Sequence, residues 1–417
     1  MKVWLRTFGC RANQYDSETV RAMVERGGGT IVPRPEEADV AVFNSCAVTA
    51  EAEAELRKGI RRVARVRPGV RTVVMGCASA RDHGALRALP TVEAVVAGAD
   101  YPLIAAALAL PPESLGPARV QGTTRGLLRI QDGCDEHCTF CATTLARGAN
   151  RSRHADAIVD EARALGERHR EIVLTGVHIG TWGADIGSSL GALVERLVRE
   201  VPAVRFRLSS VEATEVDARL AELFSDAARL APHLHAPLQS GSDAVLRRMG
   251  RHWYTRATYA FAIERLVAGR STFAIGADVI AGFPGESAAD HSETIALLES
   301  LPVTYLHVFP FSLRPGTGAE RLPGHLPGDV VQQRARELRA LGERKARRYA
   351  VGRAGGLADV VVLRGDVREG LTEDYLSVVM SADVVAGRGS MVRTRLSLGA
   401  DGSLSAVPPE SFLPVPA

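Results

Sequence analysis

The chain has 417 residues, of which 46% are hydrophobic and 24% charged, a globular mixture that excludes a disordered protein. Its net charge of +3 is too small for bulk electrostatics to indicate a nucleic-acid partner. No stretch approaches the roughly 20 apolar residues that span a bilayer, and the N-terminus shows no signal-peptide pattern. We therefore expect a cytoplasmic protein without a membrane partner, and its length favours about three domains.

The first region, residues 1–112, alternates strands and helices. We expect strands at residues 2–8, 39–43 and 71–75, and helices at residues 13–26 and 50–67. The first helix has Asn13 or Asp16 near its start, and a run of three glycines follows its end. This βαβα order predicts a parallel α/β domain.

Three cysteines of this region, Cys10, Cys46 and Cys77, each come just after a predicted strand. In an open parallel sheet the carboxyl ends of the strands share one edge, where ligands usually bind. Cysteine also packs well as a buried, unreactive residue, and a single such position would favour that interpretation. Three equivalent positions instead favour a metal site.

The second region, residues 122–350, follows a linker at residues 110–124 that contains Pro and Gly. It reads as six strand-then-helix units, with helical segments such as residues 156–170 and 287–300. Six units are fewer than the eight of a closed barrel, so we predict a partial (β/α)6 barrel. Its strands are expected at residues 127–131, 171–175, 204–209, 233–238, 273–280 and 305–310.

The third region, residues 351–417, follows a charged helix at about residues 327–349. Alternating and β-branched runs occur at residues 358–363, 375–380 and 390–396, with Gly and Asp turns between them. This pattern predicts a small β-barrel. Barrels of this size often bind RNA, although the pattern alone is weak evidence for it.

The loop after the first strand of the second region contains Cys134, Cys138 and Cys141, with the spacing Cys-x3-Cys-x2-Cys. Three thiolates on one tight loop can hold three irons of a [4Fe–4S] cube and leave the fourth iron open. Structural zinc is the alternative, but it normally takes four closed ligands. His137 is the candidate fourth ligand, and it lies inside the loop beside its neighbours. The spacing therefore favours an iron–sulfur cluster.

This loop resembles the signature of the radical S-adenosylmethionine (SAM) superfamily, with Phe140 as the aromatic residue before the last cysteine. The resemblance implies that SAM chelates the open iron and that Phe140 lies at the cofactor. One-electron cleavage of SAM would then give methionine and a 5′-deoxyadenosyl radical. That radical abstracts hydrogen from positions that polar chemistry cannot activate.

Over nearly its whole length the chain resembles the radical SAM methylthiotransferases. The resemblance rests on residues 8–18 (FGCRANQYDSE), 44–49 (NSCAVT), 76–77 (GC), 236–243 (APLQSGSD) and 283–286 (FPGE). It implies a second [4Fe–4S] cluster on Cys10, Cys46 and Cys77 that handles the sulfur to be inserted. The tail resembles the TRAM domain, an RNA-binding β-barrel, most clearly at residues 370–375 (GLTEDY).

Within this family the chain looks like the branch that methylthiolates C2 of N6-threonylcarbamoyladenosine at tRNA position 37. The matching features are residues 13–15 (NQY), Val48 with Thr49, and residues 174–180 (LTGVHIG). The isopentenyladenosine branch usually has Arg where Thr49 stands, and a Gln-Asn pair where Val177 and His178 stand. One departure is residues 142–144 (ATT), where relatives commonly carry an Ile-Pro pair.

Four other functions stay open at this point, and one of them is a pure tRNA-binding module, whose binding would survive loss of the clusters. The substrate could be isopentenyladenosine-37 in tRNA or an aspartate side chain of a ribosomal protein. A non-catalytic iron–sulfur electron carrier is a distant alternative, because a carrier has little need for a six-unit barrel or an RNA-like tail. The resemblance also implies three partners: a tRNA anticodon stem-loop, a reductant protein such as flavodoxin or ferredoxin, and a sulfur donor.

Several further residues are candidates for the site. Thr175 and Gly176 end the second strand and are candidates for the SAM amino group; an ordinary strand-end turn is the alternative. Glu212 and Gln239 follow the third and fourth strands and are candidates for contact with SAM or the nucleoside. We interpret His178 and His235 as packing histidines. The candidates for RNA phosphate contacts are Arg147 and Arg153, although solvated arginines are common on protein surfaces.

Overall fold

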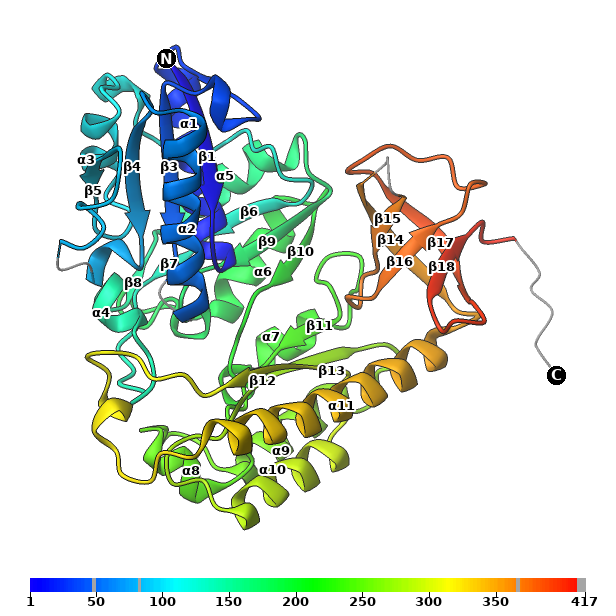
Figure 1. Ribbon diagram of the computed structural model, residues 1–417. Helices are drawn as coiled ribbons and strands as arrows, with labels where there is room; N and C mark the ends of the chain where they lie inside the picture. Colours follow the sequence, from blue (N-terminus) through cyan, green and yellow to red (C-terminus); the bar gives the residue numbers. More distant parts are fainter. Residues whose placement is uncertain (47–49, 82–83, 365–367, 411–417) are drawn as a thin grey trace.

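The computed structural model describes residues 1–46, 50–81, 84–364 and 368–410. It has three regions: an N-terminal sheet, a central group of six βα units and a small C-terminal barrel (Figure 1). The N-terminal sheet lies against the central units, and the long helix α11 (Gly328–Arg353) runs from those units to the barrel. Among the described helices, none has the length and apolar character needed to cross a membrane.

The N-terminal region is a five-stranded parallel sheet in the order β2-β1-β3-β4-β5. Its central strand β3 is buried at every position, as expected of a parallel strand covered on both faces. The helix α2 packs on one face of the sheet, and α1 and α3 pack on the other. The strands are β1 (Lys2–Thr7), β2 (Thr30–Ile31), β3 (Val40–Ser45), β4 (Arg71–Gly76) and β5 (Val92–Val95), and the helices are α1 (Arg11–Arg26), α2 (Ala50–Val66) and α3 (Tyr101–Ala107).

The predicted parallel α/β domain is confirmed, with two additions. The short strands β2 and β5 and the helix α3 were not predicted, because their runs are too brief to stand out in the sequence. Helix α1 also begins earlier than expected, with Cys10 as its N-cap residue. Asn13 and Asp16 therefore lie within its first two turns, where both are fully buried and contact other regions of the chain.

The central region contains six parallel strands in the order β6-β9-β10-β11-β12-β13. They form two three-stranded sheets, and isolated bridges from Phe206 to Leu230 and from Ser210 to His235 connect β10 to β11. The predicted partial (β/α)6 barrel is confirmed. Its strands are β6 (Gly126–Arg129), β9 (Glu171–Thr175), β10 (Arg205–Leu208), β11 (His233–His235), β12 (Ala274–Ala281) and β13 (Tyr305–Pro310).

Most helices of this region pack on the outer face of the strands and share one large hydrophobic core with them. A short antiparallel pair, β7 (Gln131–Asp132) and β8 (Arg151–Ser152), brackets the Cys134 loop. The helices are α4 (Thr143–Arg147), α5 (Ala155–Gly166), α6 (Leu190–Glu200), α7 (Ala218–Leu223), α8 (Asp243–Arg248), α9 (Arg256–Val267) and α10 (Ala288–Ser300).

The C-terminal region is a closed five-stranded barrel in the order β14-β15-β16-β18-β17, as predicted. Its core is a small group of aliphatic side chains. The predicted tail beyond residue 410 lies outside the described residues, and the domain boundaries at residues 112, 122 and 350 stay predictions. The strands are β14 (Leu357–Arg364), β15 (Glu369–Leu371), β16 (Ser377–Met380), β17 (Met391–Leu398) and β18 (Leu404–Val407).

A buried charge network fastens this barrel to the central strands. Glu171 accepts hydrogen bonds from Arg205 at 2.9 Å and from Arg207 at 2.8 Å, and all three side chains are almost fully buried. Burial alone would raise the pKa of Glu171, but the two guanidinium groups hold it well below its ordinary value. Both arginines also donate to carbonyl oxygens of the barrel, those of Asp359 and Thr372.

Candidate functional site

The Cys134 loop follows β7 and is held by backbone contacts. Gly133 has a φ of +74°, and a Cβ there would overlap the carbonyl of Ala149, so only glycine fits. The N–H of Cys134 donates to the carbonyl of Gly148 at 3.0 Å. The N–H of Thr139 donates to Met249 at 2.8 Å, which ties the loop to the end of helix α8. The loop is therefore anchored on both sides.

All three sulfur atoms of the loop accept hydrogen bonds. The N–H of Glu136 donates to Cys134 Sγ at 3.4 Å, and the N–H of Thr143 donates to Cys141 Sγ at 3.3 Å. The Arg251 guanidinium donates to Cys138 Sγ at 3.3 Å. Donors of this kind are what negatively charged cluster thiolates require, and they tune the reduction potential of iron–sulfur clusters. These donors suit three cysteine thiolates that bind an iron–sulfur cluster better than they suit three neutral thiols.

The residues predicted to bind SAM lie at the same edge as this loop. Thr175 ends β9, Glu212 follows β10 and Gln239 follows β11, all at the carboxyl ends of the central strands. A Cβ on Gly176 would overlap the Gln131 carbonyl, so the backbone here packs directly on the strand that leads to the loop. The structure brings these four residues to one edge, and their contact with SAM stays a prediction.

Phe140, also predicted at the cofactor, packs edge-on against Phe283 with ring centroids 6.4 Å apart. Both rings belong to a small hydrophobic cluster between the loop and β12. Phe140 therefore anchors the loop, and a contact between its ring and a bound cofactor stays a prediction.

Two residues beside the loop were missed as functional from the sequence. Arg251 contacts Cys138 and also forms an ion pair with Glu212, which accepts a further hydrogen bond from Trp253. Arg251 follows a short helix about a hundred residues beyond the loop, and no local motif marks it. Burial raises the pKa of the Cys138 thiol to about 12, although Arg251 acts in the opposite direction. Iron would displace the thiol proton on binding.

The second missed residue is His178, which we had interpreted as a packing histidine. Its Nδ1 lies 3.6 Å from Cys134 Sγ, and its Nε2 lies 2.7 Å from Glu215 Oε1. Burial alone would lower the pKa of His178, but hydrogen bonds to Cys134 and Glu215 and the carboxylate charges raise it to about 10. The branch signature at Val177 and His178 was the signal that could have found it.

The three N-terminal cysteines also converge. Strands β1, β3 and β4 are neighbours in the sheet, and Cys10, Cys46 and Cys77 follow their carboxyl ends. Gly9 has a φ of +97°, and a Cβ there would overlap the side chain of Cys46. The Cys77 N–H donates to the carbonyl of Ser45 at 2.9 Å, beside Cys46. Burial raises the pKa of the Cys77 thiol to about 11.

Asn13 occupies the centre of this N-terminal site. Its Nδ2 donates to the carbonyls of Phe8 at 2.9 Å and Ser45 at 2.8 Å, which joins the ends of β1 and β3. Its Oδ1 lies 3.8 Å from the sulfurs of both Cys10 and Cys77. A buried amide that satisfies two strand ends fixes the positions of the cysteines around it.

Arg147 connects the two cysteine sites. Its Nε donates to Cys77 Sγ at 3.4 Å, and its Nη1 donates to Asp132, two residues before Cys134, at 3.1 Å. Its Nη2 donates to Asn13 at 2.8 Å and Asp16 at 2.7 Å. The side chain is 3% exposed, and its guanidinium group links Cys77 to the strand that leads into the Cys134 loop.

Arg147 and Arg153 were predicted to contact RNA phosphates, and the structure gives their guanidinium groups protein partners instead. Arg153 pairs with Glu161 at 2.7 Å and lies next to Tyr15, whose hydroxyl also donates to Glu161. Burial and the Glu161 charge raise the pKa of Tyr15 to about 12. Both arginines therefore hold the N-terminal region against the central units, and an RNA contact for either stays a prediction.

The two sites suit the same type of group. The sequence has six cysteines, so each site has three, and a [4Fe–4S] cube at either site would keep one iron without a cysteine ligand. Donors to sulfur are present at both sites, from Arg251 and His178 at one and from Arg147 at the other. The donor set therefore fits two clusters.

Comparisons with known proteins agree with this geometry. The model of the uncharacterized protein family UPF0004 matches residues 2–98, and that of the radical SAM superfamily matches residues 128–298. A threonylcarbamoyladenosine tRNA methylthiotransferase, MtaB of Thermotoga maritima, is 33% identical, with 97% of this chain and 96% of that protein covered. The chain belongs to the radical SAM methylthiotransferase family.

A second relative has a different substrate in its name. The tRNA-2-methylthio-N(6)-dimethylallyladenosine synthase of Cereibacter sphaeroides is 32% identical, with 97% of this chain and 98% of that protein covered. Among solved structures, the radical SAM methyltransferase TsrM of Kitasatospora setae shares the fold at a TM-score of 0.58, with 15% identity and 76% of each chain covered.

Family membership makes the chain an enzyme, a transferase that uses SAM and two [4Fe–4S] clusters. The predictions of a radical SAM enzyme with these cofactors are confirmed. The distant alternative, a non-catalytic electron carrier, is wrong.

Proposed function

We propose that this methylthiotransferase inserts a methylthio group at C2 of the adenine of N6-threonylcarbamoyladenosine at position 37 of tRNA. The observation that carries the proposal is that Arg147 contacts Cys77 of one site and Asp132, on the strand that leads into the loop of the other site. A sulfur-handling site and a radical-generating site must face one substrate carbon, and a buried side chain that joins the two sites supports this arrangement.

When bound, the cofactors of the Cys134 loop supply a 5′-deoxyadenosyl radical that removes hydrogen from an unactivated carbon. The chain's own residues provide position. Arg251 and His178 hold the sulfurs of the loop, and Arg147 holds Cys77. The substrate base would lie between the two sites, with its C2 edge toward both.

The choice of nucleoside rests on the segment that follows β9. Residues 174–180 resemble the threonylcarbamoyladenosine branch, and His178 in this segment lies beside Cys134. The branch residues Val48 and Thr49 lie outside the described residues. Relatives named for dimethylallyladenosine are similar to the same degree, so methylthiolation of isopentenyladenosine-37 is the second candidate.

The proposed partners follow from the same function. The substrate partner is a tRNA anticodon stem-loop, and the closed C-terminal barrel is the proposed RNA-binding module. A reductant protein such as flavodoxin or ferredoxin would deliver the electron for SAM cleavage. A sulfur donor would supply the inserted atom.

The test is mass spectrometry of tRNA nucleosides from cells with and without this gene. We expect loss of 2-methylthio-N6-threonylcarbamoyladenosine and accumulation of its precursor without the methylthio group. If the isopentenyladenosine derivative disappears instead, the second candidate is correct. If both nucleosides are unchanged, the tRNA substrate is wrong, and an aspartate of a ribosomal protein becomes the next candidate.

A further inference from the structure

The inner, concave face of the central strands is polar at β11 and β12. Along β11 the residues His233 and His235 alternate with Leu234, which lies in the hydrophobic core on the helix side. Asp278 on β12 likewise alternates with the core residues Ala277 and Val279. Because successive side chains of a strand point to opposite faces, the histidines and Asp278 point to the concave side.

Other regions of the chain cover much of this concave face. Tyr15 of helix α1 packs on Leu127 and Val173, over β6 and β9. Tyr375 of the C-terminal region stacks on His233 at a centroid distance of 4.3 Å. The face is open at β12 and β13, where the side chain of His307 is 52% exposed.

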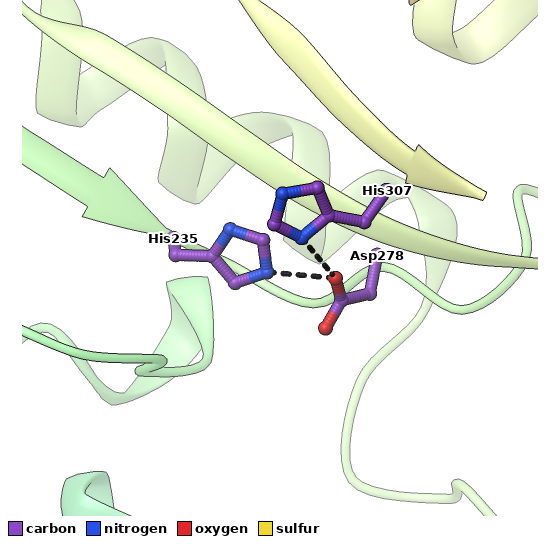
Figure 2. A group of neighbouring side chains, drawn as sticks. All are labelled: His235, Asp278 and His307. Atoms are coloured by element: carbon purple, nitrogen blue, oxygen red, sulfur yellow. Dashed lines mark hydrogen bonds and ion pairs between the residues drawn. The ribbon is translucent and has the colours of Figure 1, made fainter. Parts of the chain in front are cut away.

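At this opening His235, Asp278 and His307 form one group, which we call the lumen triad (Figure 2). His235 Nε2 lies 2.8 Å from Asp278 Oδ1, and His307 Nδ1 lies 3.2 Å from the same oxygen. Burial alone would raise the pKa of Asp278, but the two imidazoles hold it well below its ordinary value. Asp278 is therefore a carboxylate, which only accepts hydrogen bonds.

A second layer of contacts fixes the triad. The Tyr305 hydroxyl lies 3.1 Å from His235 Nδ1 and 2.8 Å from His233 Nε2. A Cβ on Gly276 would overlap the Tyr305 ring, so this glycine leaves the room that the ring occupies. Asp278 Oδ2 has no hydrogen-bond partner in the described part of the chain. The triad thus keeps one acceptor oxygen without a partner on the concave face.

The backbone of the triad is joined to the predicted cofactor edge. The Gln239 N–H donates to the Asp278 carbonyl at 2.8 Å, and His235 is bridged to Ser210, two residues before Glu212. Glu212 pairs with Arg251, which contacts Cys138. The triad therefore lies close in the fold to the residues that follow β10 and β11 and contact the Cys134 loop.

We propose that Asp278, oriented by His235 and His307, accepts a hydrogen bond from the ribose 2′-hydroxyl of the target nucleotide. This inference rests on the proposed RNA substrate. A carboxylate is a common partner of ribose hydroxyls, and the 2′-hydroxyl distinguishes RNA from DNA. The N6 substituent fits this position poorly, since the carboxylate of a threonylcarbamoyl group would be repelled by Asp278.

The test compares two synthetic anticodon stem-loops that carry N6-threonylcarbamoyladenosine and differ only in a 2′-hydroxyl or 2′-hydrogen at that nucleotide. The anaerobic holoenzyme with SAM and dithionite is assayed on both, and the ratio of the two kcat/KM values is recorded. We expect the wild type to prefer the ribonucleotide by about tenfold or more, the effect of a hydrogen bond to a charged group.

Asp278→Ala should reduce this ratio to within about twofold of one, because it removes the acceptor, whereas Asp278→Asn keeps a neutral acceptor and should reduce the ratio only in part. His307→Ala should reduce it partially, since the imidazole only orients Asp278. The matched control, His325→Ala, alters an exposed histidine outside the triad and should retain the wild-type ratio. A purely structural role of Asp278 would lower both rates equally and leave the ratio unchanged, and that result would overturn the proposal.

Two further outcomes are informative. The triad could instead hold a metal ion. If EDTA brings the kcat/KM ratio of the wild type close to one and Mn²⁺ restores the preference for the ribonucleotide, the proposal is wrong. Failure of the proposed function is distinguishable. In that case the wild type would leave the threonylcarbamoyladenosine loop unmodified but act on an isopentenyladenosine loop. The ribose is the same in both nucleosides, so the ratio on the second loop tests Asp278 independently.

Discussion

The two cysteine sites of this enzyme are built in different ways. Cys134, Cys138 and Cys141 lie on one loop after β7, and backbone contacts of that loop position all three. Cys10, Cys46 and Cys77 come from three separate strand ends and meet only because β1, β3 and β4 are neighbours. The first site depends on local loop geometry, whereas the second depends on the topology of a whole sheet.

The difference has a physical consequence for robustness. A loop site can be disturbed only by changes in the loop or its direct supports. A site made from strand ends also responds to changes in the packing of the region that contains the sheet. The two sites share one support, Arg147, so substitutions can be chosen that affect one site, the other or both.

The largest expected effect comes from removing one cysteine at each site. Cys138→Ala should lower the rate of reductive SAM cleavage by roughly a thousandfold or more, because the proposed radical-generating site is lost. Cys77→Ala should leave 5′-deoxyadenosine formation measurable and abolish methylthiolated product. Each variant should lose about half of the iron of the wild type. The measurements are iron content and 5′-deoxyadenosine and nucleoside analysis of the same sample.

These variants also test the division of labour. If Cys77→Ala abolished SAM cleavage as completely as Cys138→Ala, the two sites would not be separate, and the contrast between them would be wrong. Retention of full SAM cleavage by Cys138→Ala would contradict the assignment of the radical site.

The next largest effect is expected for Arg147→Leu. This change removes a cation that pairs with Asp16 and Asp132 while both carboxylates stay buried or partly buried. Removing one partner of a buried ion pair costs about 3–5 kcal/mol in the free energy of unfolding, and we expect the lower end of this range because Arg129 still pairs with both carboxylates. Chemical denaturation measures this loss.

The Arg147 variant should also affect both sites together. We expect lower cluster occupancy at the N-terminal site. We also expect lower occupancy at the Cys134 loop, since Asp132 lies only two residues before Cys134. Arg163→Leu is the matched control, because Arg163 pairs with Asp160 and Glu200 on the surface and should cost less than about 1 kcal/mol. Equal losses for the two variants would mean that Arg147 does not support the sites.

How much of each site the sequence predicts follows from the same contrast. The Cys134 loop is visible as a spacing of three cysteines, and its position after the first central strand was predicted. The N-terminal site required the further step that three strand ends share one edge, which the alternation of strands and helices supports. The contacts of Arg251 with Cys138 and of Arg147 with Cys77 could not be predicted, because each joins residues that are far apart in the sequence.

The fold shows the same limit. The parallel sheet, the six central units and the C-terminal barrel could be predicted because most of their strands and helices each have a recognisable hydrophobic pattern in the sequence. The short strands β2 and β5 have two and four residues and form only because a neighbouring strand is present. Arg147 and Arg153 were predicted to contact RNA phosphates at the protein surface. Their contacts between the N-terminal and central regions could not be predicted, because local sequence does not show which regions pack together.

A pair of glycines gives a smaller and more selective test. Gly133→Ala places a Cβ against the Ala149 carbonyl, and Gly9→Ala places one against Cys46. Both glycines have a positive φ, so each alanine should cost about 1–3 kcal/mol of local strain. We expect Gly133→Ala to deplete the radical cluster and Gly9→Ala to deplete the other.

Iron content and SAM cleavage separate the two variants, and equal effects on SAM cleavage would contradict the prediction. Gly69→Ala, with no atom within 4 Å of the added Cβ, is the control.

The smallest effect is expected for His178, whose Nδ1 lies 3.6 Å from Cys134 Sγ. A donor to a cluster thiolate stabilises the reduced state, which carries more negative charge. If this hydrogen bond contributes about 1 kcal/mol, its loss in His178→Leu should lower the reduction potential of the radical cluster by roughly 40 mV.

Potentiometric titration with electron paramagnetic resonance measures this shift, and His178→Gln, which keeps a donor, should restore most of it. The second cluster provides an internal reference, because no described contact links His178 to Cys10 or Cys77. A shift of both potentials would indicate a general loosening of the protein. A shift of the radical cluster alone would show that His178, a residue of the branch signature, acts on this cluster through its contact with Cys134.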